Sequence, residues 1–191
     1  MSKVVLDMSM SLDGYVAASG RTPDEPLGQG GERLHEWAFA EDDPRNREII
    51  SRGAELLGAM VTGRGTYDDS IRWWGEDGPT GRARLPLFVV TSREAEDYGV
   101  YRFVTDGFES AVAQAKAEAG GKVVGVSGAR IGYQLIRAGL VDELFVHIVP
   151  VLFGGGTPLY EAVGGEHVGL EPLEVIETPA ALHVRYRVSA P

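Results

Sequence analysis

Short apolar runs rich in valine and leucine recur along the chain, and each ends in a turn that contains glycine or a polar residue. Such runs are typical of strands that are buried on both faces. We predict strands at residues 3–10, 59–62, 87–90, 101–104, 123–126 and 141–149, with a short apolar run at 15–17.

The segments between these runs carry helical patterns or helix breakers. We predict helices at residues 32–40, 44–57, from 67 onward, 108–119 and 130–138. Residues 18–31 hold four glycines and two prolines, so we expect a long loop, and long ordered loops are often lids. Residues 73–84 are expected to form an exposed polar loop that carries two tryptophans.

The last two predicted strands, at residues 170–177 and 182–189, form a hairpin that turns at Pro179 and Ala180. Polar and apolar residues alternate in the second strand, which predicts that His183, Arg185 and Arg187 face water. The apolar alternates are Leu182, Val184, Tyr186 and Val188. Together these elements predict one α/β domain over residues 1–191, with a mainly parallel sheet and an antiparallel edge.

Composition narrows the classes of function. The net charge of −10 and the absence of a basic block disfavour nucleic acid as a partner. The chain has no cysteine, and its four histidines are not at metal-ligand spacing, so we expect no metal site. No signal peptide and no apolar run long enough for a membrane span is found, so we expect a cytoplasmic protein without membrane contacts.

Three predicted strands end in turns that suit a phosphate group. These turns are Gly63 to Thr66, Thr91 to Arg93 and the segment from Ser127 to Gly132. A glycine turn before a helix points free N–H groups outward, and ligands of open α/β sheets bind at the carboxyl ends of strands. Arg64, Arg93 and Arg130 would each add a cation, although Arg64 is also consistent with a surface charge and Thr66 with a helix N-cap.

Groups for acid–base chemistry are few. Asp13 and Glu36 flank the predicted lid and are the candidate carboxylates; Asp13 could instead be a turn residue, and Glu36 part of a solvated helix face. His147 lies inside a predicted strand, where a packed or hydrogen-bonded side chain is the better interpretation. No nucleophile elbow and no Walker lysine pattern is found, which disfavours hydrolases and kinases.

Five motifs in order resemble the dihydrofolate reductase-like family, and more closely its bacterial branch around the reductase domain of riboflavin biosynthesis. They are SLDGYVA (11–17), VTGRGTYDD (61–69), FVVTSR (88–93), VSGARIGYQLIRAGLVDEL (126–144) and VPVLFGGGTPLYE (149–161). The resemblance implies a three-layer sheet with helices on both faces, a homodimer, and NADPH as cofactor.

The resemblance also implies roles for individual residues. The residues that would hold the cofactor are Gly63, Arg64, Thr66, Thr91, Ser92, Arg93, Ser127, Gly128, Ala129, Arg130 and Ile131. Asp13, Glu36, Trp37, Gly154 and Gly155 would face the substrate, and Asp13, Glu36 or ordered water would supply a proton. Trp37 is equally consistent with a core residue packed beside Leu34.

Two departures from the family pattern narrow the expectation. Dihydrofolate reductases have a Gly-Gly pair with a cis peptide where this chain has Ser127-Gly128, and a cis bond is costly without proline. Their acidic residue early in the first helix has no clear counterpart, since Glu32 and Glu36 lie on either side of that place.

We therefore expect a reductase that transfers hydride from NADPH to a C=N or C=O group of a small, pterin- or pyrimidine-like substrate. The alternatives are a pyrimidine reductase of the riboflavin type and a non-catalytic dimeric protein that binds NADP.

Overall fold

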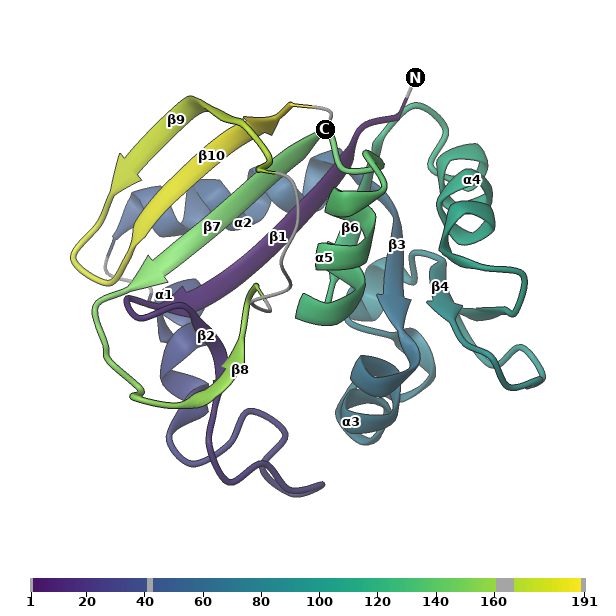
Figure 1. Ribbon diagram of the computed structural model, residues 1–191, viewed down its shortest axis with the longest axis horizontal. Coiled ribbons are helices and arrows are strands. Elements are labelled where there is room, and N and C mark those ends of the chain that lie inside the picture. The colour runs from purple at the N-terminus through teal and green to yellow at the C-terminus, as the bar shows by residue number, and fades with distance from the viewer. Residues whose placement is uncertain (1, 41–42, 161–166, 190–191) are drawn as a thin grey trace.

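The valine-rich runs form the strands of an eight-stranded sheet in the computed structural model, which describes residues 2–40, 43–160 and 167–189 (Figure 1). The order across the sheet is β5-β4-β3-β6-β1-β7-β10-β9. In chain order the strands are β1 (Val4–Ser11), β3 (Leu57–Gly63), β4 (Leu87–Val90), β5 (Tyr101–Val104), β6 (Val123–Ser127), β7 (Glu143–Val149), β9 (Leu170–Glu177) and β10 (Leu182–Val188).

Pairing is parallel from β5 through to β7 and antiparallel for β10 with both β7 and β9. The expected mainly parallel sheet with an antiparallel C-terminal hairpin is therefore confirmed. Five α-helices are placed between the strands in the described residues: α1 (Glu36–Phe39), α2 (Pro44–Leu56), α3 (Arg64–Trp74), α4 (Phe108–Glu118) and α5 (Ala129–Arg137).

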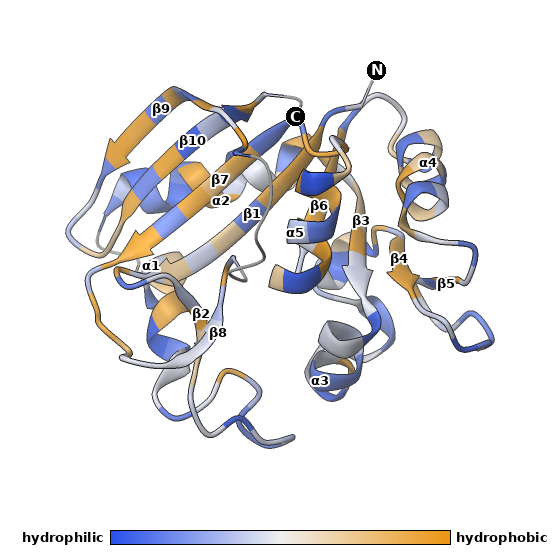
Figure 2. Ribbon diagram, viewed as in Figure 1, coloured by the Kyte–Doolittle hydropathy of each residue, from blue (hydrophilic) through white to orange (hydrophobic). Residues whose placement is uncertain are grey.

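Helices cover both faces of the sheet, as the resemblance implied. On one face, Ala111 and Ala115 of α4 and Leu135 of α5 share a buried cluster with Val4 and Leu6 of β1. In Figure 1, α4 and α5 lie in front of the strands, whereas α2 lies behind β7 and β10. Figure 2 shows the strands as mostly hydrophobic and the helices as banded with hydrophilic residues, as expected for a sheet between two layers of helices.

On the other face, the packing is divided between two clusters. Trp37 of α1 and Ile49 of α2 pack with Val5 and Phe145 near the middle of the sheet. Residues of α3 pack over β4 and β5, with Tyr67 in edge-to-face contact with Tyr101 at 5.0 Å between ring centroids. Alternate side chains of each central strand thus supply one cluster or the other.

A second, two-stranded sheet was not expected from the sequence. It pairs β2 (Tyr15–Ala18) with β8 (Gly156–Pro158) and brings the late glycine turn beside the first strand–loop segment. The approach is close at Gly156, where a Cβ would lie 2.0 Å from the carbonyl oxygen of Ala17. Glycine is required there because any side chain would collide with that backbone.

Some expected element boundaries were wrong. The helix expected from residue 67 begins at Arg64, and the two tryptophans of the expected polar loop complete it; Trp74 packs with the β4–β5 cluster, while Trp73 is exposed. The expected helix at 32–40 is a 3-10 turn, Gly31–His35, followed by the single-turn α1.

The expected outward orientation of His183 was also wrong, because this side chain is fully buried. Leu182, whose side chain lies on the other face of β10, is 38% exposed. The cause is that Trp37 of α1 packs against the His183 ring, at 4.7 Å between ring centroids, so this face of β10 is not open to water at His183.

Candidate active site

The three glycine or polar turns meet at one edge of the sheet. β4, β3 and β6 are neighbours and parallel, so their carboxyl ends lie side by side. Thr62 is in register with Ser127, and its hydroxyl donates to the Ser127 carbonyl oxygen at 2.9 Å. The sequence thus places its three candidate turns at one edge, where open α/β sheets bind ligands.

Two helix N-termini touch at the centre of this edge. Gly63 precedes α3 and Gly128 precedes α5; a Cβ on Gly128 would lie 2.4 Å from Thr66 Oγ1. Gly128 also has a φ of 102°, which disfavours other residues. The first turns of both helices carry free N–H groups and a partial positive charge, an arrangement that suits a diphosphate.

The remaining residues expected around this diphosphate position divide into two groups. Ala129 and Arg130 lie in the first turn of α5, and Arg130 is exposed. Ile131 is buried, and its side chain packs against Gly63, so it supports the turn from beneath. The peptide between Ser127 and Gly128 is trans, in agreement with the argument that serine disfavours a cis bond there.

Arg64 is held by its neighbours rather than directed freely outward. Its Nε donates to Asp68 Oδ1 at 2.7 Å, one helical turn away, and its guanidinium lies over the rings of Tyr67 and Phe103 at 5.5 and 5.8 Å. Thr66 does not act as an N-cap, since Gly63 occupies that position. The backbone of this turn is therefore better placed than the Arg64 side chain to meet a phosphate.

The third turn lies at the outer end of the same edge. Thr91 is buried, and its hydroxyl accepts from the backbone N–H of Arg93 at 3.0 Å, which fixes the turn. Ser92 and Arg93 are exposed beyond it. This leaves a guanidinium and a hydroxyl at the end of β4, two donor groups that suit a phosphate monoester.

Asp13 organises the late glycine turn. Its carboxylate accepts from the Ser11 hydroxyl at 2.6 Å and from the backbone N–H groups of Gly154 and Phe153 at 2.7 and 3.1 Å. The Ser11 hydrogen bond is the main cause that lowers the pKa of Asp13, with the two backbone donors adding to it. Asp13 is therefore ionised near neutral pH and is better suited to position the turn than to donate a proton.

Gly155 continues this turn and lies close to the loop that follows β2. A Cβ at Gly155 would be 3.2 Å from the hydroxyl of Ser19. The structure thus brings together Asp13, Gly154 and Gly155, all of which were expected on the substrate side.

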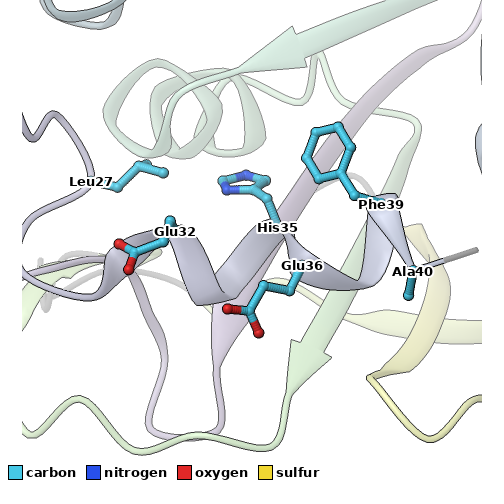
Figure 3. Close-up of a pocket in the computed structure, with 6 residues that line it drawn as sticks. All are labelled: Leu27, Glu32, His35, Glu36, Phe39 and Ala40. Atoms are coloured by element: carbon cyan, nitrogen blue, oxygen red, sulfur yellow. The ribbon is translucent and has the colours of Figure 1, made fainter.

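Glu36 lies at the surface, on the rim of a shallow pocket below the loop. Figure 3 shows the side chains of Leu27, His35 and Phe39 on one side of the helical segment that carries Glu36, and the Glu36 side chain on the other side. Phe39 is 81% exposed, so the pocket presents an aromatic ring to solvent. The pocket is lined by Leu27, Glu32, His35, Glu36, Phe39 and Ala40.

Trp37 points into the core, where the packing interpretation places it. It is buried in one cluster with Leu34, and its indole Nε1 donates to Ser9 Oγ at 2.9 Å. The ring lies against His147 at 4.2 Å and His183 at 4.7 Å between centroids. The alternative role, in which the indole forms a wall against the substrate, stays a prediction. Because Trp37 is buried, it would act on the substrate by supporting the residues that touch it.

Comparison with known proteins assigns the chain to a family. The RibD C-terminal domain profile matches residues 2–184, nearly the whole chain. The chain belongs to the RibD C-terminal domain family.

Solved structures similar to this RibD C-terminal domain share its fold. A putative riboflavin biosynthesis protein from Shewanella sp. PV-4 is 20% identical, with a TM-score of 0.73 and 99% of each chain covered. The riboflavin biosynthesis reductase of Saccharomyces cerevisiae is 15% identical, with a TM-score of 0.61 and coverage of 98% of this chain and 90% of that one. Dihydrofolate reductase from Enterococcus faecalis, complexed with NADP(H), is 17% identical with a TM-score of 0.58, covering 97% and 96%. The dihydrofolate reductase-like fold is thereby confirmed.

The loop after β2 is tied to α3, the helix that follows the Gly63 turn. Arg21 forms an ion pair with Asp69 of α3, and Asp24 forms one with Arg72 of the same helix. The loop supplies the cation of the first pair and the anion of the second, and α3 supplies the opposite charge in each. The loop therefore reaches from the β2–β8 sheet across to α3, and its role as a lid stays a prediction.

One polar group under the sheet was not expected from the sequence. Asp7 accepts a hydrogen bond from, or shares a proton with, His147 Nε2 at 2.9 Å, and His147 Nδ1 lies 2.7 Å from His183 Nδ1. The available signal was a carboxylate inside the apolar run of β1. The histidine pair itself arises from register, because His147 and His183 face each other across β7 and β10.

The described residues hold neither a group of side chains suited to a metal ion nor a helix suited to spanning a membrane. Within residues 2–40, 43–160 and 167–189, no group of three or more His, Cys, Asp or Glu side chains could hold a metal ion. None of the helices in these ranges is long and apolar enough to cross a membrane.

Proposed function

We propose that this protein is an NADPH-dependent reductase that transfers hydride to a C=N or C=O group of a small heterocyclic substrate, pterin- or pyrimidine-like. The observation that carries the proposal is the contact between Gly128 and Thr66, where the N-termini of α3 and α5 meet beside the end of β4. Two helix N-termini and an exposed arginine on one sheet edge match the three phosphates of an NADP-type dinucleotide.

The similar structures support the same chemistry. One of them is a dihydrofolate reductase complexed with NADP(H), and another is a riboflavin biosynthesis reductase. The family to which the chain belongs is the C-terminal domain of RibD. We carry over from these the class of reaction and of cofactor, and we leave the substrate at the level of a flat nitrogen heterocycle.

The chain's residues would divide the work by position. The first turns of α3 and α5 would bind the diphosphate, and Thr91, Ser92 and Arg93 would bind the adenosine 2′-phosphate. The bound cofactor supplies the hydride. Asp13 would fix the 153–155 turn on the substrate side, and the loop after β2 would exclude water when it closes. Protonation falls to Glu36 or ordered water, because the lowered pKa of Asp13 keeps this carboxylate ionised.

The test is steady-state oxidation of NADPH in the presence of pterins, aminopyrimidines with and without a ribosyl group, quinones and imines. We expect turnover with at least one nitrogen heterocycle. The matched control is Gly128→Val, which places side-chain atoms on Thr66 and should abolish NADPH binding while leaving the sheet intact. Turnover confined to ribosylated aminopyrimidines would favour the pyrimidine reductase, and tight NADPH binding without any turnover would favour the non-catalytic protein.

A further inference from the structure

We propose that Asp7 is a substrate-recognition carboxylate, which the buried His147–His183 pair positions, and that it selects substrates whose reducible C=N group is protonated. This inference rests on the proposed reductase function and names the charge state of its substrate. It assigns a role to a polar network that the cofactor edge and the Asp13 turn do not use.

The first argument is the place of Asp7 in the sheet. It lies on β1, a central strand, one residue beyond Leu6, which is in register with Val126 of β6. Both strands are parallel, so Asp7 is level with Ser127, the residue that precedes the Gly128 turn. The carboxylate therefore lies on the strand next to the cofactor edge and close to its carboxyl end.

The second argument is exposure. The Asp7 side chain is 51% exposed, although strands flank β1 on both sides. It lies on the opposite face to Val4 and Leu6, which α4 and α5 cover, and on the same face as Ser9, to which Trp37 of α1 is bonded. An exposed carboxylate on a central strand means that the face is open to solvent at this point, between the segments that α1 and α3 cover.

The third argument is the support behind the carboxylate. His147 is 2% exposed, and both of its ring nitrogens are engaged, Nε2 by Asp7 and Nδ1 by His183. Its ring is packed between Trp37 and Phe145, at centroid distances of 4.2 and 4.4 Å. One Asp7 oxygen is thus held in a fixed direction. The half-exposed side chain can therefore bind a ligand with a smaller loss of conformational entropy than a freely rotating surface aspartate.

The bonding pattern is consistent with one proton on each histidine ring. A proton on His147 Nε2 is donated to the Asp7 carboxylate, which leaves His147 Nδ1 to accept the Nδ1 proton of His183. His183 Nε2 then accepts from the Thr178 hydroxyl at 3.3 Å. In this arrangement Asp7 keeps its negative charge. A negative group attracts a cation and repels an anion.

The chemistry that follows is the reduction of a protonated imine or amidine. The hydride adds to the carbon of C=N–H⁺, the π pair moves to nitrogen, and the proton already on nitrogen stays there, so the product is a neutral amine. Asp7 would stabilise the cation and raise its population near neutral pH, and it would give up no proton itself. A carbonyl substrate would gain nothing from this carboxylate.

The experiment compares two flat probes of the same shape, benzamidinium and neutral benzamide, by isothermal titration calorimetry with and without NADPH. We expect wild-type protein to bind benzamidinium about 10- to 100-fold more tightly than benzamide, the usual effect of one charge-assisted hydrogen bond. Asp7→Asn should remove this difference and leave benzamide and NADPH affinity unchanged. Asp7→Ser serves as a second variant should the first fail to fold.

Two controls separate recognition from folding. Glu118→Gln removes an exposed carboxylate at the end of α4 and should change neither affinity. His147→Gln keeps a donor for Asp7 and should retain more benzamidinium affinity than His147→Leu, whereas a merely structural role predicts that both variants behave alike.

Equal affinity of the wild-type protein for the two probes, or an Asp7→Asn variant that retains the difference, would overturn the inference. Failure of the wild-type protein to bind NADPH would instead overturn the proposed function, and the titrations without NADPH would still report on Asp7.

Discussion

At the scale of single residues, the polar groups under the sheet are joined into one network. Ser9 accepts from Trp37, which packs on His147 and His183, and His147 reaches Asp7. The buried members of this network are bonded to one another, which is what allows polar groups to lie in the interior. Substitutions within it should therefore affect stability first and the ligand only where a side chain is exposed.

Trp37→Phe tests whether the indole packs or contacts substrate. The change keeps most of the apolar volume but leaves the Ser9 hydroxyl without its donor, so we expect a loss of about 1–3 kcal/mol in the free energy of unfolding. Urea unfolding measures this loss, and NADPH affinity should be unchanged. An unaltered unfolding free energy together with a raised KM would show that the indole contacts the substrate.

His183 predicts a defined pH dependence of stability. Burial is the main cause that lowers the pKa of His183 to about 4, and the neighbouring His147 ring, which disfavours a second proton close by, adds to it, so the native state holds His183 neutral. The unfolded chain binds this proton at about pH 6.5. Between these values the unfolded state carries more protons, so stability is complete above about pH 6.5 and falls as the pH drops toward 4.

The measurement is the unfolding free energy of wild type and His183→Gln between pH 4 and 7. We expect the wild type to lose on the order of 2 kcal/mol more than the variant over this interval. His35, whose pKa burial also lowers, is present in both proteins and cancels in the difference. The same slope in both proteins would show that His183 does not titrate as described.

At the scale of elements, apolar runs that end in glycine or polar turns were sufficient to locate the main strands. The bounds of β4, β5 and β9 agree with the expectation, because each run is short and ends in a turn. β8 was missed because its three residues carry no apolar pattern and pair only through backbone contacts with β2. The orientation of His183 was missed because alternation identifies two faces of a strand and does not say which one a distant helix will cover.

For the same reason, only part of the candidate site could be predicted from the sequence. Strand-end turns indicated the edge at which we propose that the cofactor binds, since parallel strands bring their carboxyl ends together. The Asp7–His147–His183 network depends on the register of three strands that are far apart in sequence, and on Trp37 of α1 packing against the two histidine rings. Neither property can be obtained from local pattern.

The loop after β2 should open when its ion pairs to α3 are broken. Arg21→Glu places like charges against Asp69, and Asp24→Arg does the same against Arg72. These pairs are exposed, so we expect little change in global stability and a larger change in loop opening. Hydrogen exchange of residues 19–30 should become several-fold faster in each variant, and high salt should have a similar effect on wild type.

The charge-exchanged double variant Arg21→Glu with Asp69→Arg should restore slow exchange. Arg187→Glu is the matched control, since it breaks an ion pair with Glu171 on the hairpin, away from the loop. Faster exchange in this control, or none in Arg21→Glu, would contradict the assignment of the loop contacts.

At the scale of the whole molecule, the C-terminal hairpin leaves an apolar surface at the edge of the sheet. Val175 is 61% exposed and Leu170 is 46% exposed; their partners on β10, Val184 and Val188, are buried, and Val188 belongs to the core on the α4–α5 face. Figure 2 shows hydrophobic colour along much of β9, the edge strand, whereas β10 is largely hydrophilic. An exposed edge strand with apolar side chains is prone to pair with another chain.

We therefore predict a homodimer that buries the β9–β10 hairpin. Light scattering after gel filtration at micromolar concentration should give about twice the mass of one chain. Val175→Asp should shift the mass toward the monomer, whereas Glu118→Gln, at the end of α4 and outside the hairpin, should leave it unchanged. A monomeric wild-type protein at this concentration would contradict the prediction.

The central claim is that the edge formed by β4, β3 and β6 binds NADPH, and Arg93 is its most direct test. Equilibrium titration of wild type and Arg93→Ala with NADPH and NADH measures the claim without knowledge of the substrate. We expect wild type to prefer NADPH, and Arg93→Ala to lose about 10- to 100-fold in NADPH affinity with NADH affinity nearly unchanged. Equal losses for the two cofactors would contradict the role of Arg93, and the absence of saturable binding of either by wild type would contradict the claim itself.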